Sequence, residues 1–224
     1  MLSKTKIPMY IAAQLENSKT CDRVWLTLPV SKDRFAAALA KISVTRGEFV
    51  VSDYAVKVPK LSQRMLKQTP LAAVNYLAAR LNTLTDDAII KLCAICDTDY
   101  YFDYIGQYID YTYSPGDYTL LPGITDAEAL GEYYLGGNRR IIADARLNKC
   151  VDRREYGKNL AAVENGVFSP LGYITSKSNW SYKFKDRAVP EHLNLKGFIG
   201  EDIYADWEED NDYGKPTYPA TSGA

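Results

Sequence analysis

The beginning of the chain switches between strand-like and helix-like patterns, and this succession constrains the fold more than any other feature. Residues 9–15 ("MYIAAQL") and 23–28 ("RVWLTL") read as two strands. Ser31 is a suitable N-cap for a helix over residues 32–42, and residues 48–58 ("EFVVSDYAVKV") follow as an extended segment. The apolar face expected for this helix comprises Phe35, Ala38, Leu39 and Ile42. A small sheet covered on one side accommodates this order, so the sequence predicts an α+β fold.

The extended segment contains Asp53, whose carboxylate allows two interpretations. It could be a catalytic group at the end of a strand, or a residue that only shapes the chain. In "SDY" an aspartate can accept a hydrogen bond from nearby backbone and bend the strand. We expect Asp53 to be a turn and surface residue.

Helical patterns dominate the middle of the chain. Thr69 and Pro70 suit the N-cap and first position of a helix with a stripe of apolar residues. Thr85 suits the N-cap of a second helix, "DDAIIKLCAIC". Residues 97–121 are rich in tyrosine and acids and are broken by "SPGD", and no regular element is assigned to them.

Two more helices and an extended segment are expected further on. "TDAEALGEYYL" opens with a capping box from Thr125 to Glu128. "REYGKNLAAVENG" is expected to be a helix ended by Gly166, and "GVFSPLGYI" returns to extended structure.

These elements divide the chain into four parts. We expect an N-terminal α+β domain (1–60), a central helical domain (61–96), an acidic, tyrosine-rich C-terminal α+β domain (97–180) and a polar extension (181–224). The composition of the extension indicates that it is partly disordered or wraps an existing domain.

The formal net charge of −1 conceals a strong polarisation along the sequence. Residues 1–60 hold ten Lys/Arg and five Asp/Glu, whereas residues 97–138 hold eight acids and no base. Residues 201–214 add seven acids, again without a base. The eight acids of residues 97–138, called the acidic block below, are Asp97, Asp99, Asp103, Asp110, Asp117, Asp126, Glu128 and Glu132.

Several functional classes lack support in the sequence. His192 is the only histidine, so the usual general base and metal ligand are nearly absent. Cys93 and Cys96 form a CxxC pair, but at the far end of a predicted helix, where the helix dipole does not favour a thiolate. No nucleophile elbow, zinc-protease, Walker or dinucleotide-binding motif occurs. We therefore expect no enzyme, cofactor or metal, and reduced, structural cysteines.

The cellular location is expected to be the cytoplasm. The sparse cysteines suit a reducing compartment. No signal peptide or apolar run long enough to span a bilayer is recognisable, so no membrane association is expected.

Nine of the 18 tyrosines lie between residues 100 and 134, interleaved with the acidic block. One interpretation is a solvated acidic surface above a tyrosine-lined core. The other is a rigid negative surface, in which packed tyrosines hold outward-facing carboxylates as substitutes for nucleic-acid phosphates. The composition alone allows both.

The order of motifs resembles the ArdA antirestriction family. "IPMYIAAQL", "RVWLTLP", the following helix and "GEFVVSDYAVKVP" resemble that family's opening strands and "DYE" segment. "LAAVNYLAARLNTL", "DAEALGEYYL" and "CVDRREYGKNLAAVENGVFSPLGYI" continue the resemblance over residues 7–175, and Asp53–Tyr54 falls on the non-catalytic "DY" position.

The resemblance implies an elongated, three-domain, non-enzymatic homodimer that mimics DNA. Such a protein occupies the DNA-binding groove of a type I restriction-modification enzyme, contacts its methyltransferase core and protects a mobile genetic element from host defence. The carboxylates expected to act are those of the acidic block. Two alternatives stay open: inhibition of another restriction or CRISPR-type complex, and nucleic-acid binding through the basic N-terminal unit.

The chain departs from the family pattern in its charge. "WLTLP" stands where the family has "WIDLP", and "CVDRRE" stands where it has "YIDYE". B-DNA carries one charge per roughly 1.7 Å of axis, so eight aligned carboxylates imitate only about 14 Å of duplex. The sequence therefore predicts mimicry of a short footprint.

Overall fold

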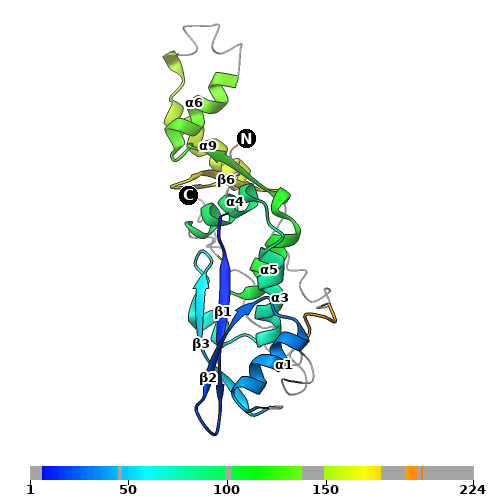
Figure 1. The fold of residues 1–224 in the computed structure, drawn as a ribbon. Helices are drawn as coiled ribbons and strands as arrows, with labels where there is room; N and C mark the ends of the chain where they lie inside the picture. Colours follow the sequence, from blue (N-terminus) through cyan, green and yellow to red (C-terminus); the bar gives the residue numbers. More distant parts are fainter. Residues whose placement is uncertain are drawn as a thin grey trace.

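The computed structural model describes residues 7–44, 47–98, 102–137, 149–177, 190–195 and 198. Helices mix with two small antiparallel sheets, so the α+β class is confirmed. The fold is elongated: the first sheet lies at one end and the helix pair α6–α9 at the other (Figure 1).

The first sheet has the strand order β2-β1-β3 and is antiparallel throughout. Its strands are β1 (Tyr10–Asn17), β2 (Arg23–Leu28) and β3 (Phe49–Lys57). Burial alternates along β1, where Ile11, Ala13 and Leu15 face the core. Helix α1 (Lys32–Lys41) contacts this sheet at β2, and all four residues of its expected apolar face are buried. Ser31 Oγ accepts the Arg34 N–H at 3.5 Å, which confirms the predicted N-cap.

Asp53 lies within β3, not at a turn. It is half-buried, and its Oδ1 accepts the backbone N–H of Tyr54 at 2.9 Å. The β1–β3 register shifts between Gln14 and Leu15, opposite this point. The expected contact with local backbone is therefore present, at an irregularity in the strand pairing.

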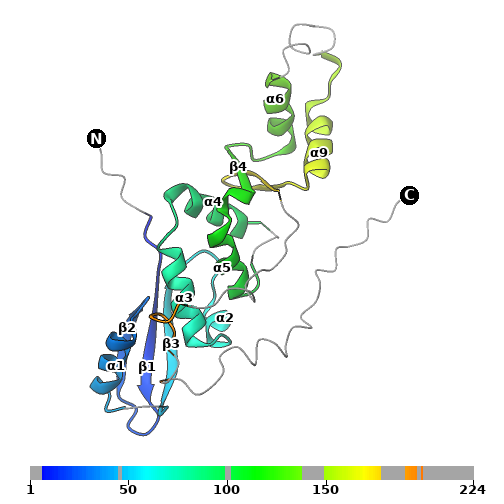
Figure 2. The same ribbon diagram turned by 90° about the vertical axis from the view of Figure 1, so that its right-hand side faces the viewer.

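Four helices follow the first sheet (Figure 2): α2 (Gln63–Lys67), α3 (Leu71–Leu81), α4 (Asp86–Cys96) and α5 (Ile105–Tyr113). Helices α2 and α5 were not expected. Helix α3 is buried at every position from Leu71 to Ala78, because other elements surround it. Thr85 Oγ1 accepts the Ala88 N–H at 3.3 Å and caps α4 as predicted.

The predicted N-cap at Thr69 is wrong. Its hydroxyl donates to the Met65 carbonyl at 2.8 Å, at the end of α2, while Pro70 occupies the N-cap position of α3. The unexpected helix α2, immediately before α3, gives Thr69 a carbonyl to bind.

One buried amide joins three segments at the middle of the molecule. Asn75, on α3, is fully buried. Its Oδ1 accepts the Val30 N–H at 2.7 Å, and its Nδ2 donates to the carbonyls of Val30 and Leu193, both at 3.0 Å. Both amide hydrogens and the oxygen are therefore used, and the amide binds α3 to the β2–α1 loop and to a segment 118 residues away.

The second sheet has the order β4-β6-β5 and is also antiparallel. It consists of β4 (Tyr118–Pro122), β5 (Val167–Ser169) and β6 (Gly172–Ser176), and a short 3-10 turn, η1 (Pro115–Asp117), precedes it. The expected extended segment after Gly166 is confirmed.

Helices α6 (Ala127–Gly137) and α9 (Arg153–Glu164) pack against each other at the end of the molecule. The expected capping box at Thr125 is wrong, because Asp126 Oδ1 accepts the Ala129 N–H at 2.8 Å and serves as the cap. Asn165 ends α9 in a left-handed conformation, and the Gly166 N–H donates to the Ala161 carbonyl at 2.9 Å.

Two glycines let the backbones of α6 and α9 touch. A Cβ on Gly157 would overlap the Ala127 carbonyl oxygen, and a Cβ on Gly131 would overlap that of Arg153. Each glycine therefore faces the first residue of the opposite helix. Isolated glycines in helical sequence, as in "LGEYY" and "REYGKN", are the sequence signal of such an approach.

The division into three domains stays a prediction. One buried cluster contains residues from β1, α1, α3, α4 and α5 and so spans residues 60–61 and 96–97. Leu130 and Leu135 of α6 are buried but lie outside this cluster. The helix pair therefore has contacts of its own at one end of the chain.

We expect Asn75→Leu to lower the free energy of unfolding by about 3 kcal/mol. The change leaves one N–H and two carbonyls without the amide that pairs with them, and each such buried group costs about 1–3 kcal/mol. Urea unfolding measures the effect. The same substitution at exposed Asn159 is the control and should change stability by less than about 0.5 kcal/mol.

The glycine contact predicts opposite results for two Gly→Ala changes. Gly157→Ala should destabilise the helix pair by about 1–3 kcal/mol, because the methyl group forces the backbones apart. Gly136→Ala meets no atom within 4 Å and should stabilise α6 by about 0.5–1 kcal/mol. Thermal unfolding followed by circular dichroism compares them, and equal shifts would contradict the close approach.

Candidate partner-binding surface

The acidic block divides into two groups along the molecule. Seven of its eight residues are described, and Asp99 lies outside the described residues. The central group, on α4, α5, η1 and the loops between them, comprises Asp97, Asp103, Asp110 and Asp117. The end group, at the start of α6 and along it, comprises Asp126, Glu128 and Glu132. Figure 1 shows α6 at the far end of the molecule and α5 near its middle.

The central group mixes exposed and half-buried carboxylates. Asp97, at the C-cap of α4, and Asp103, just before α5, are exposed. Asp110 and Asp117 are half-buried. Asp97 and Asp103 are therefore the members of this group most open to a partner.

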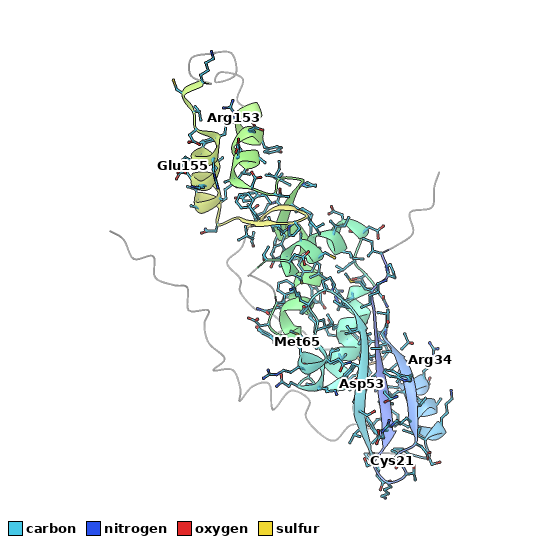
Figure 3. All side chains as sticks on the ribbon, turned by 90° about the vertical axis from the view of Figure 1, so that its left-hand side faces the viewer. Cys21, Arg34, Asp53, Met65, Arg153 and Glu155 are labelled. Carbon is cyan, nitrogen blue, oxygen red and sulfur yellow. The ribbon has the colours of Figure 1, made fainter. Side chains whose placement is uncertain are left out.

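The end group is exposed, but basic residues of α9 lie beside it. Glu132 Oε1 is 3.6 Å from Arg153 Nε. On the same helix, Lys158 Nζ lies 2.6 Å from Glu155 Oε1. Figure 3 shows Arg153 and Glu155 at this end, opposite Cys21 at the sheet end. The block contains no base in sequence, yet the fold brings cations of α9 next to α6.

Two tyrosines that lie between the acids of the block in sequence are core residues, and they hold α5 in place. Tyr108 donates its hydroxyl to the Pro59 carbonyl at 2.9 Å, and Tyr111 donates to the Ala88 carbonyl at 2.5 Å. Burial raises the pKa of both phenols. These contacts fix α5 against α4 and the end of β3.

Three other tyrosines of the same stretch of sequence are exposed and do not belong to the core. Tyr104 and Tyr113 are each 40% exposed, and Tyr133 is 51% exposed. Tyr113 lies under the Arg80 guanidinium, 3.8 Å from the ring centroid. The surface around the carboxylates is therefore partly aromatic.

Glu164 fixes α6 to α9 and to the second sheet. It accepts the Tyr134 hydroxyl at 2.7 Å and the Tyr173 hydroxyl at 2.9 Å, one on each carboxylate oxygen. The hydrogen bond to Glu164 raises the pKa of Tyr134 to about 12. No sequence pattern indicates this residue, because the pairing depends on three elements that are distant in sequence.

The cysteines are all free thiols, and Cys93 and Cys96 are helical, as expected. Cys96 is fully buried, and burial raises its pKa to about 12. Burial also raises the pKa of Cys93. Both thiols therefore stay protonated at neutral pH.

The described residues hold no group of three or more His, Cys, Asp or Glu side chains arranged for a metal ion. Within the same residues, no helix is long and apolar enough to cross a membrane. His192 is exposed and lies in a turn.

A family model described as antirestriction protein (ArdA) matches residues 17–175. The chain belongs to the ArdA family. The match covers more than half of the chain and confirms the resemblance stated from the sequence motifs. No curated protein matches the sequence. Membership in the ArdA family, whose proteins are non-enzymatic, supports an antirestriction function and implies interaction with restriction enzymes.

The thiols of this ArdA-family chain should react in the order of their exposure. Cys21 and Cys150 are exposed and should be alkylated first by iodoacetamide at pH 8. Cys96 should react only after unfolding, because almost none of it is thiolate below its raised pKa. Peptide mass spectrometry identifies the modified residues. Rapid labelling of Cys96, or stoichiometric zinc in the purified protein, would contradict this assignment.

Proposed function

We propose that this protein is a non-enzymatic, DNA-mimicking inhibitor of a type I restriction-modification enzyme. The observation that carries the proposal is the ArdA family match over residues 17–175. The inhibitor occupies the groove in which the methyltransferase core binds DNA, so it competes for a site and breaks no bond. It acts in the cytoplasm of the host, where it protects incoming mobile DNA.

Two features of the fold support this mechanism. The molecule is elongated, and carboxylates occur both near its middle and on its end helix pair (Figure 1). Hydrogen bonds of Tyr108, Tyr111 and Glu164 hold in place helices that carry these carboxylates. Negative charges fixed on a rigid surface attract a basic groove and steer its approach.

The footprint of the mimic is short. Eight carboxylates correspond to about 14 Å of duplex at one charge per roughly 1.7 Å. A homodimer, which the family resemblance implies, doubles this number. The proposed contact therefore covers part of a DNA groove, with the exposed carboxylates of both groups in the leading role.

A second candidate is inhibition of another defence complex, such as a different restriction system or a CRISPR-type complex. The formal net charge of −1 and the excess of bases in residues 1–60 favour it, because a protein of this charge covers less of a long DNA groove. A pull-down from hosts that carry known defence systems distinguishes the two candidates.

A variant with four carboxylates replaced by amides tests the mimicry. It carries amides in place of two exposed carboxylates from each group: Asp97→Asn, Asp103→Asn, Glu128→Gln and Glu132→Gln. We expect inhibition of DNA cleavage by the type I enzyme to weaken at least tenfold, with little change in melting temperature, because these groups are exposed. Inhibition by the parent should also weaken as salt rises.

The control removes the same charge elsewhere on the surface. It carries Asp22→Asn, Asp33→Asn, Glu48→Gln and Asp87→Asn, all at exposed positions outside the acidic block and the helix pair. This variant should inhibit like the parent. Equal inhibition by both variants and the parent would show that the acidic block is not the contact surface.

A further inference from the structure

A segment near the C-terminus packs against the N-terminal part of the fold. We call residues 190–195 together with Phe198 the C-terminal anchor, and it lies beside α3 in both ribbon views (Figure 1 and Figure 2). Leu195 is fully buried in the main core cluster, and Leu193 and Phe198 pack against that cluster. The anchor forms a turn and joins neither of the described sheets, so contacts with side chains hold it in place.

Three side chains of the fold contact the anchor, and we call them the docking surface: Lys32, Phe35 and Asn75. Lys32 Nζ, at the start of α1, lies 2.6 Å from Glu191 Oε1. The Phe35 ring, on the same helix, meets the Phe198 ring edge-on, with centroids 5.5 Å apart. A base and an aromatic ring of the docking surface are thus each matched by a complementary group of the anchor.

The third member, Asn75, binds the backbone of the anchor. Its Nδ2 donates one hydrogen to the Leu193 carbonyl at 3.0 Å, while its other hydrogen and its oxygen bind Val30. Without an occupant, the first N–H loses its protein acceptor, although the rest of the amide stays bound. A side chain that binds a backbone carbonyl recognises a chain segment without regard to the side chain at that position. The docking surface therefore suits a peptide that offers a carbonyl next to an apolar side chain.

The docking surface and the anchor differ in their relation to the family. Lys32, Phe35 and Asn75 lie within residues 17–175, which match the family model, whereas the anchor lies beyond them. The occupant is therefore an addition to a surface that belongs to the family part of the chain. A segment tethered in the same chain reaches an effective concentration on the order of millimolar, so it excludes free ligands of modest affinity.

We propose that the docking surface is a binding site for a peptide segment of a partner protein, and that the C-terminal anchor closes this site in the free protein. The anchor shows the chemistry of the ligand: an acid, leucines two and four residues later, and an aromatic residue three positions after the second leucine. A partner segment with this pattern binds when the anchor leaves. The inference does not depend on which enzyme the protein inhibits.

The test uses a fluorescent synthetic peptide with the sequence of residues 190–198 as the ligand. The released variant is the full chain with Leu195→Ser and Phe198→Ser, which removes apolar contacts of the anchor and leaves the docking surface unchanged. The matched control carries Val163→Ser and Leu171→Ser, at two exposed apolar positions elsewhere in the fold. Fluorescence anisotropy measures binding, and circular dichroism checks that each chain is folded.

We expect the released variant to bind the peptide at least about tenfold more tightly than the parent and the control, in which the tethered anchor competes. A peptide that carries Leu195→Ser should bind the released variant at least about tenfold more weakly, because this leucine is fully buried in the anchor. No binding by the folded released variant, or equal binding of the two peptides, would overturn the inference.

A second measurement uses a chain that keeps the anchor and decides the matter alone if the released variant does not fold. In the Leu195→Cys variant, iodoacetamide reaches the introduced thiol only when the anchor opens, and buried Cys96 is the internal reference for global unfolding. We expect the introduced thiol to react at least about tenfold faster than Cys96. An excess of unlabelled peptide should speed this reaction further, because it holds the anchor open. Labelling no faster than that of Cys96, or no acceleration by the peptide, contradicts a separable anchor.

Discussion

The fold depends on the side-chain amide of Asn75. It is fully buried, and its oxygen and both of its hydrogens bind backbone groups of two segments that lie far apart in the sequence. A buried polar side chain is tolerated only when its hydrogen bonds are formed, so this amide accepts few alternative arrangements of its neighbours. The β2–α1 loop, helix α3 and the segment 190–195 therefore take up one mutual arrangement.

The other end of the molecule is held together by different means. Helices α6 and α9 touch through their backbones at Gly131 and Gly157, and Glu164 joins them to the second sheet through two tyrosine hydroxyls. Leu130 and Leu135 of α6 are buried, whereas the exposed side chains on the outer faces of both helices are open to solvent or a partner. The acids of α6 and the bases of α9 lie on this exposed surface, so a partner meets both signs of charge there.

Most helices and strands could be predicted from the sequence, because N-cap residues and apolar periodicity are patterns within a few neighbouring residues. Strand β2 and the helix behind Ser31 were found in this way. Helix α5 gives no such local signal, because residues 97–121 are a run of tyrosines and acids broken by "SPGD", and its buried face includes Tyr108 and Tyr111 in place of aliphatic residues. The pairing of Glu132 with Arg153 and the role of Asn75 could not be predicted, since both depend on contacts between elements distant in sequence.

The contact between Asn75 and Leu193 also orders events during synthesis. The two residues are 118 positions apart, and a ribosome adds about 5–20 residues per second, so about 6–24 s separate their synthesis. During that interval one side-chain N–H of Asn75 lacks its protein acceptor, and the surface that Leu195 later covers is exposed to water. The N-terminal unit is therefore completed only after Leu193 and Leu195 have been synthesised. Until then, its apolar surface is exposed to non-native contacts.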